Sequence, residues 1–383
     1  MLDIAPVDLE AARRAREAEG GFLWWYVDVV GPDGEGLVAI WSYGLPFLPG
    51  YAASDRKGHA PPAAERPSLN LALYRNGEPD FYLLREYEPE RAVWTSEESR
   101  WEFGETVITS ARCGGERRVH LDIDCSVPGT DERVNGDVRI SGPVPSFDEL
   151  SDGSSGFEHR WEPGIVGGGA SVDLEMPGAT RRCFEGAAYH DANCGTTPFH
   201  RLGIQRWIWA RLPHRDGELV FYALRDENGP GAIAEASLPH ENGDRTRRVV
   251  LEFDGDGNCR IHRDVQLTLG DSRRDMAGMQ YWRRLTWAAG AAADWSPLTL
   301  EVDAVVDRGP FYMRLQIRQD QGERGFAELI RPRRIDLDRH RPLVRMAVDQ
   351  SGERNSAWLP LFSGPREGRL QRLVSYNTGW GRG

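Results

Sequence analysis

The sequence predicts an all-β protein in which two antiparallel β-barrel domains pack together behind one short N-terminal helix. Three observations favour this fold class. Short apolar or alternating runs recur along the chain, 43 Gly and 24 Pro separate them, and helical periodicity is nearly absent after the first twenty residues. The 383 residues suffice for two domains, so the expected boundary divides residues 1–190 from residues 191–383.

The first half is expected to contain one helix and a series of strands. Residues 1–20 include DLEAARRAREAEG, which predicts a short amphipathic helix. This segment has neither the basic nor the apolar region of a signal peptide, so we expect a cytoplasmic protein. The runs after it are strand-sized and separated by turns such as GPDGEG. The expected strands lie in 22–30, 37–45, 69–77, 81–87, 101–108, 118–126 and 134–141.

The second half repeats this pattern. The run DGDGN at 254–258 imitates the start of a calcium loop, but the sixth position is Cys259 and the twelfth is Val265, so it predicts a hairpin turn. The Gly- and Ser-rich stretch 151–169 is expected to be a loop or part of the domain junction. The expected strands lie in 205–212, 217–224, 247–262, 280–287, 298–306, 311–318 and 325–331.

Charge and cysteine content exclude several classes of protein. Lys and Arg number 47 against 59 Asp and Glu, and the net charge of −12 has the wrong sign for nucleic-acid binding. No run approaches the eighteen apolar residues of a membrane-spanning helix. The five Cys lack CxxC spacing and no His lies at metal-ligand spacing, so we expect reduced thiols and no metal. No cofactor-binding motif stands out either.

The densest polar segment is 189–195, YHDANCG, followed by RWIWAR at 206–211. An acid, an imidazole, an amide and two indole rings near a domain junction could form a ring-lined pocket with a proton donor. Alternatively, the polar side chains hold a turn and the contact between domains by hydrogen bonds, while Trp207 packs in a core. The residue types leave both interpretations open.

The chain contains 13 Trp residues. In a strand, Trp24 and Trp25 must point to opposite faces, so one ring enters the barrel and the other leaves it. Aromatic cavities suit long apolar or polyene ligands, and the rings can stabilise carbocations. Core packing explains most of these residues equally well.

Several stretches together resemble the bacterial carotenoid 1,2-hydratases (hydroxyneurosporene synthases) and their AttH-like relatives, over almost the whole chain. They are GGFLWWYVDVVGPDGEGLVAIW, LNLALY, YHDANCGTTPF with QRWIWAR, GELVFYAL, and PFYMRLQIR with GFAELIRP. The resemblance implies two lipocalin-like barrels and a hydrophobic isoprenoid or polyene substrate near the domain interface. It also implies a cofactor-independent lyase or isomerase that protonates a C=C. Water then captures the cation in a hydratase, or an internal alkene captures it in a terpenoid cyclase.

Within this resemblance we expect Asp191 to be the acid, with an apolar site keeping its carboxyl neutral until it reacts. His190 and Tyr222 would orient it or return the proton. Asp191 could instead hold the domain junction. The side chains expected to bind the substrate are Trp25, Asn193, Trp207, Trp209 and Arg211.

The chain departs from the family pattern at three positions. The hydratases read HDHNWG where this chain has Ala192 and Cys194, and Tyr-x-Asp where this chain has Tyr222 and Leu224. These losses favour cyclisation or isomerisation over hydration. They also leave open a lipocalin-like Diels-Alderase of secondary metabolism or a non-catalytic pigment or lipid carrier. Because the substrate is insoluble in water, we also expect transient contact with a membrane surface.

Overall fold

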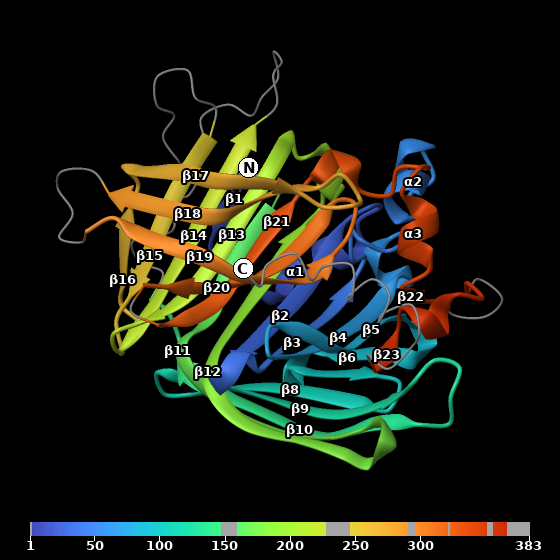
Figure 1. Cartoon of the computed structure of the whole chain (residues 1–383). Helices are drawn as coiled ribbons and strands as arrows, with labels where there is room; N and C mark the ends of the chain where they lie inside the picture. The colour runs from blue at the N-terminus through green and yellow to red at the C-terminus, as the bar shows by residue number, and fades with distance from the viewer. Residues whose placement is uncertain are drawn as a thin grey trace.

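Two large, mostly antiparallel sheets form the protein (Figure 1). The computed structural model describes residues 2–146, 159–226, 246–289, 296–320, 322–350 and 355–365. Within these residues strands predominate and helices are few and short, so the all-β prediction is confirmed.

The first sheet contains 14 of the described strands. Its main path runs in the order β22-β5-β4-β3-β2-β12-β11-β10-β9-β8-β7-β6, while β1 pairs in parallel with β11 and β23 pairs with β5. Its strands are β1 Leu2–Ile4, β2 Phe22–Val30, β3 Gly36–Tyr43, β4 Pro67–Arg75, β5 Glu78–Glu86, β6 Ala92–Thr95, β7 Arg100–Phe103, β8 Thr106–Cys113, β9 Glu116–Ser126, β10 Arg133–Pro143, β11 His159–Met176, β12 Thr180–Gly195, β22 Val348–Asp349 and β23 Gly364–Pro365.

The second sheet contains nine described strands in the order β16-β15-β14-β13-β21-β20-β19-β18-β17. The predicted hairpin turn at 254–258 joins two of them, and the Asp254 side chain accepts the backbone N–H groups of Asp256 and Asn258. Its strands are β13 Ile204–His214, β14 Gly217–Asp226, β15 Thr246–Phe253, β16 Cys259–His262, β17 Val265–Arg274, β18 Gln280–Ala289, β19 Leu298–Arg308, β20 Tyr312–Gln319 and β21 Arg324–Ile330.

Helices occupy few of the described residues. The predicted N-terminal helix is α1, Leu9–Glu17, and the Asp8 side chain caps it by accepting the Ala11 N–H at 2.7 Å. The other α-helices are α2, Tyr51–Arg56, and α3, Arg341–Arg345. Within the described part of the chain, none of the helices is long and apolar enough to cross a membrane.

The Gly-rich stretch forms a strand where a loop or junction was expected. Residues 159–169 belong to β11, which pairs with β10 on one side and β12 on the other. The expectation of a loop is therefore wrong for 159–169, because pairing with β12 holds this stretch in the sheet, with an irregular register around Gly167, whose φ is +58°. Residues 151–158 lie outside the described part of the chain. The expected domain boundary falls within β12, and the division into domains stays a prediction.

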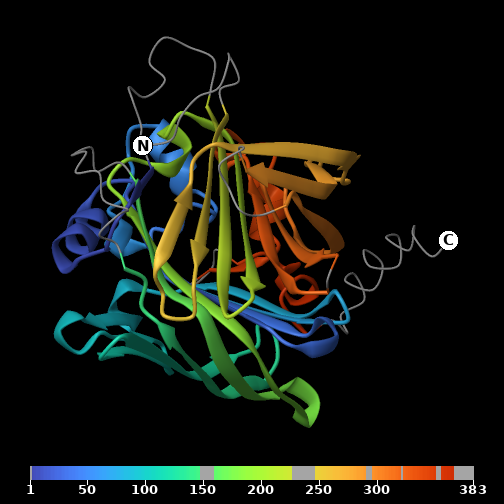
Figure 2. The same ribbon diagram turned by 90° about the vertical axis from the view of Figure 1, so that its left-hand side faces the viewer.

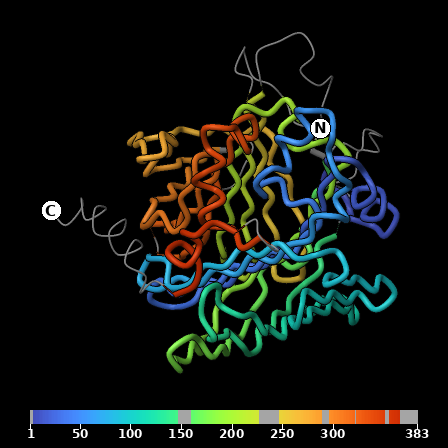
Figure 3. The backbone as a smooth tube through the Cα atoms, turned by 90° about the vertical axis from the view of Figure 1, so that its right-hand side faces the viewer, coloured from blue at the N-terminus to red at the C-terminus, as the bar shows by residue number. Residues whose placement is uncertain are grey.

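Three apolar layers result from the curvature of the sheets. The first sheet curls so that β6–β10 lie on one side of β2–β5, and the second sheet lies on the other side (Figures 2 and 3). One core fills the curl of the first sheet and another fills the curl of the second. The third core, here called the inter-sheet layer, lies between the two sheets and holds side chains such as Tyr26, Tyr189 and Trp209.

Candidate active site between the sheets

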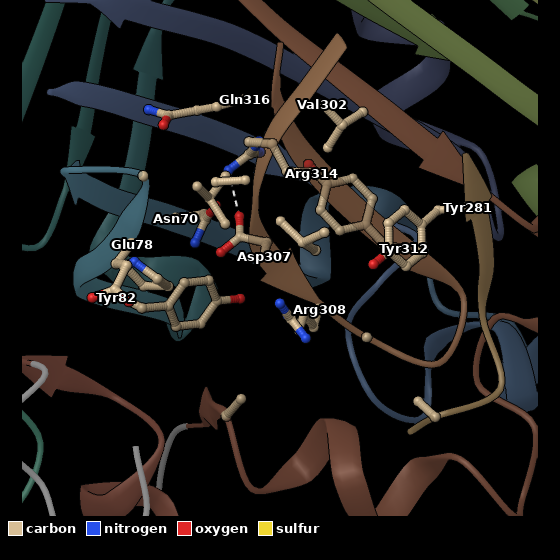
Figure 4. Close-up of a pocket in the computed structure, with 18 of the residues that line it drawn as sticks. Asn70, Glu78, Tyr82, Tyr281, Val302, Asp307, Arg308, Tyr312, Arg314 and Gln316 are labelled. Atoms are coloured by element: carbon tan, nitrogen blue, oxygen red, sulfur yellow. Dashed lines mark hydrogen bonds and ion pairs between the residues drawn. The ribbon is translucent and has the colours of Figure 1, made fainter. Parts of the chain in front are cut away.

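A cavity of about 1830 Å³ lies at the side of the inter-sheet layer that β3–β5 and β19–β20 form (Figure 4). Part of the lining is polar, and the group that we call the polar wall consists of Asn70, Tyr82, Asp307, Tyr312 and Arg314. Further charged side chains, among them Arg283 and Asp303, also line the cavity. Most other positions are apolar, as expected for a site that holds a hydrophobic ligand. The apolar lining includes Ile40, Leu45, Phe47, Leu84, Val302, Val306, Phe311, Val344, Val348 and Phe362.

Arg314 organises the polar wall. Its side chain is 1% exposed and lies between two carboxyl groups: Nη1 donates to Asp307 Oδ2 at 2.7 Å, and Nε donates to Glu328 Oε1 at 3.1 Å. Tyr74 donates to the same Asp307 oxygen and Tyr312 to the same Glu328 oxygen, both at 2.7 Å. One guanidinium therefore serves two carboxyl groups, and both bonds from described residues to Glu328 reach Oε1.

The environment of Glu328 favours the protonated form of its carboxyl. Burial raises the pKa of its carboxyl above the ordinary value, and the nearby Arg314 charge only partly opposes this effect. Its side chain is still 14% exposed, and both of its hydrogen-bond partners line the cavity. The carboxyl thus combines a tendency to keep its proton with a place immediately behind the cavity wall.

Asp191 lies deeper in the inter-sheet layer. Its carboxyl accepts hydrogen bonds from Trp161 Nε1 at 2.8 Å, Tyr189 OH at 3.0 Å and Asn193 Nδ2 at 3.0 Å. Burial raises the pKa of Asp191 to about 8, although these donors favour the ionised form. The carboxyl is therefore mostly protonated at neutral pH.

Three further predicted site residues gather around Asp191. The Tyr222 ring lies 4.8 Å from the Trp161 ring and 5.3 Å from the Trp207 ring, centre to centre. The Trp209 ring lies 5.5 Å from the Tyr189 ring. The structure thus brings Asp191 and Asn193 together with Tyr222, Trp207 and Trp209 in one aromatic cluster.

His190 and Trp25 lie on the opposite face of the first sheet. Adjacent residues of a strand point to opposite faces, so His190 cannot share the surroundings of Asp191. His190 Nδ1 lies 2.9 Å from the Tyr26 carbonyl oxygen and its ring stacks on Trp41, while burial lowers its pKa to about 3. Trp25 packs 4.7 Å from the Trp101 ring inside the curl of the first sheet.

The positions that depart from the family pattern divide in the same way. Ala192 and Cys194 face the core of the first sheet, whereas Leu224 faces the inter-sheet layer, as does the retained Tyr222. The three departing positions therefore do not converge on one site in this chain.

Arg211 joins the two sheets. Its fully buried guanidinium forms ion pairs with Asp28 of β2 and Glu218 of β14, the latter at 3.2 Å, and donates to the Ala187 carbonyl of β12. Burial raises the pKa of Glu218 to about 7. Here too one cation serves two carboxyl groups, and Arg211 is not part of the cavity wall.

Sequence reasoning missed the polar wall of the cavity. The sequence feature that could have indicated it is a charged residue at an inward-facing position of an apolar strand. Glu328 lies between the buried Phe326 and Ile330, and Arg314 shares a strand face with Tyr312.

A layer of rings lies between the cavity and Asp191, since the Arg314 guanidinium is 5.9 Å from the centre of the Tyr26 ring. Among the described residues, no three His, Cys, Asp or Glu side chains converge in a way that could hold a metal ion.

Comparison with known proteins agrees with the resemblance seen in the sequence. A family model described as carotenoid hydratase CrtC matches residues 40–348. An acyclic carotenoid 1,2-hydratase from Rubrivivax gelatinosus is 33% identical over 230 residues, covering 57% of this chain and 52% of that protein. The enzyme of the same name from Thiocapsa roseopersicina is 28% identical over 218 residues, covering 57% of this chain and 51% of that protein. The chain thus spans about half the length of these relatives.

A solved structure shares the fold. The AttH structure from Nitrosomonas europaea matches with a TM-score of 0.50 at 14% identity, covering 82% of this chain and 93% of that chain. At this identity the likeness concerns the fold, and it agrees with the expected lipocalin-like architecture.

Proposed function

The chain belongs to the carotenoid hydratase CrtC family, and from this premise we propose that it is a cofactor-independent enzyme that protonates a C=C of an isoprenoid or polyene. The observation that carries the proposal is the cavity between the sheets, which has an apolar lining, Asp307 and Arg314 in its wall, and Glu328 held behind that wall by Arg314. The volume of about 1830 Å³ exceeds that of ordinary small-molecule sites, which suits a long apolar chain.

Glu328 is the proposed proton donor. Tyr312 and Arg314 fix Oε1, which directs the remaining oxygen away from these partners. Asp191, the acid expected from the sequence, accepts three hydrogen bonds and lies behind the rings of Tyr26 and Tyr189 as seen from the cavity. A carboxyl that must reach an alkene needs access, so Glu328, which is 14% exposed behind Tyr312 and Arg314, is better placed than the buried Asp191, the second candidate.

The reaction balances without an added reagent. The Glu328 carboxyl gives its proton to one alkene carbon, a C–H bond forms, and the other carbon becomes a tertiary cation near the rings of the cavity wall. In hydration a water oxygen bonds to the cation, and the surplus water proton returns to the carboxylate. In cyclisation an internal alkene attacks the cation and forms the new C–C bond. The carbon next to the resulting cation then loses a proton, which returns to the Glu328 carboxylate.

Incubation of the protein with acyclic carotenoids and linear polyprenyl compounds in heavy water tests this proposal. We expect a product with one new C–D bond, whose mass distinguishes hydration from cyclisation. A product isomerised without deuterium would favour the pericyclase, and a ligand recovered unchanged would favour the carrier.

Variants then assign the acid. Glu328→Gln should lower turnover about 10²- to 10⁴-fold, the usual contribution of a general acid. Glu175→Gln, an exposed carboxyl of β11, serves as the matched control and should keep full activity. If Asp191→Asn loses turnover while Glu328→Gln keeps it, the acid is Asp191. Full activity in both variants would refute protonation by either of these two carboxyls.

A further inference from the structure

The cavity opens where two apolar side chains reach water. Five large hydrophobic side chains are strongly exposed among the described residues, and two of them line this cavity. Met276, in the turn between β17 and β18, is 92% exposed, and Leu343, on α3, is 51% exposed. Because both side chains contact the cavity and the solvent, they mark its mouth.

Hydrogen bonds hold the two sides of the mouth together. Arg334 precedes α3, and its guanidinium donates to the carbonyl oxygens of Ala277 and Gly278 in the β17–β18 turn, at 3.2 and 3.1 Å. The Asp275 side chain closes the same turn by accepting the Met279 N–H at 2.6 Å. The turn and the segment leading into α3 therefore hold each other in place.

Arginines outnumber acidic side chains around this mouth, although the protein has a net charge of −12. Residues 331–345 carry six Arg against two Asp. On α3 and just before it, Arg339 and Arg345 are exposed, and on the opposite side of the mouth Arg273 and Arg308 are exposed and line the cavity. The charge of this region is thus opposite to that of the whole chain.

We propose that this region, the mouth face of Met276, Leu343, Arg273, Arg308, Arg339 and Arg345, docks on a membrane surface rich in anionic phospholipids. Exposed apolar side chains beside arginines are what an interfacial site requires: the apolar groups enter the boundary of the acyl chains and the arginines contact lipid phosphates. The acidic remainder of the protein is repelled by the same surface, which orients the mouth toward the bilayer.

Docking in this orientation joins the cavity to the place where a polyene dissolves. An apolar ligand would pass from the acyl region between Met276 and Leu343 without crossing water. This route for the ligand rests on the proposed function, whereas the docking is inferred from the exposed apolar side chains and the arginines of the mouth face.

Sedimentation of the full chain with lipid vesicles tests the docking. We expect the protein to sediment with vesicles of phosphatidylcholine and phosphatidylglycerol, weakly with phosphatidylcholine alone, and less as salt rises. The double variants Met276→Glu with Leu343→Glu, and Arg339→Glu with Arg345→Glu, should each lower binding about tenfold or more. Val93→Glu is the control, since Val93 is 47% exposed on β6, at the opposite edge of the first sheet.

Equal binding by the wild type and both double variants would overturn the proposal, as would an equal loss in Val93→Glu or failure to bind anionic vesicles at all. These vesicles hold no polyene, so the outcome is independent of the chemistry. Vesicle binding without any deuterated product would leave the docking intact and refute the proposed function.

Discussion

Asp191→Asn should remove a large pH dependence from the stability of the fold. Burial raises the pKa of Asp191 from 3.8 to about 8, so between these values the native state keeps a proton that the unfolded chain releases. Stability is then lost as pH rises through this interval, because the unfolded chain binds fewer protons. One proton corresponds to about 1.4 kcal/mol per pH unit, and to about 6 kcal/mol over the interval as an upper bound.

An asparagine at position 191 has the planar shape and the neutral charge of the protonated aspartic acid, but it does not titrate. Its amide oxygen can still accept from Trp161 Nε1 and Tyr189 OH, which both reach Oδ2 in the wild type. Its amide nitrogen would face the Asn193 amide nitrogen, and rotation of the Asn193 amide restores that hydrogen bond when His159 Nε2, 2.9 Å from Asn193 Oδ1, becomes the acceptor through a change of tautomer. We therefore expect a modest loss of stability at mildly acidic pH and a variant more stable than the wild type above the pKa.

Urea unfolding at a series of pH values measures this difference. Glu218 and Glu328 also titrate with raised pKa values, but they do so in both proteins, so the difference in slope isolates Asp191. Asp131→Asn, which removes an exposed carboxyl, should keep the wild-type slope. Parallel curves for wild type and Asp191→Asn would refute the neutral state of this carboxyl.

Three other variants test the remaining parts of the structure. Arg211→Ala leaves the buried carboxyls of Asp28 and Glu218 without their cation and should cost about 3–5 kcal/mol in urea unfolding; a loss below about 1 kcal/mol would contradict the ion-pair assignment. Trp25→Ala should cost about 3–5 kcal/mol without changing KM, whereas a raised KM would support the predicted contact with substrate. Ala347→Trp narrows the cavity and should raise KM about tenfold or more at an unchanged melting temperature; an unchanged KM would exclude this cavity as the substrate site.

Strand positions could be predicted because side-chain alternation is a local property of the chain. The prediction that the rings of Trp24 and Trp25 separate is confirmed on the same ground: Trp25 belongs to the core of the first sheet and Trp24 packs against the inter-sheet layer. The same rule divides His190 from Asp191, although their adjacency in sequence favoured a single site.

The grouping of Asp307, Arg314 and Glu328 depends on strand register, which the sequence does not reveal. Asp307, Arg314 and Glu328 come from three consecutive strands of the second sheet, and Arg314 pairs directly with both of the other residues. Only the pairing of β19, β20 and β21 puts them in one row. A charged residue among inward-facing apolar positions indicates a buried ion pair, but it does not reveal which residues on the neighbouring strands are its partners.

The return of the chain to the first sheet has a consequence for self-association. Val348 pairs in parallel with Leu84 and Gly364 pairs with Tyr82, so β22 and β23 occupy the free side of β5, with an ion pair between Arg85 and Asp349 at 2.5 Å. Without this strap, β5 would present a row of unpaired amide and carbonyl groups beside apolar side chains, which is a template for strand addition by another molecule. A chain cut before β22 should therefore aggregate through β5. These short strands cover the edge of β5, and Val348 of β22 also lines the cavity.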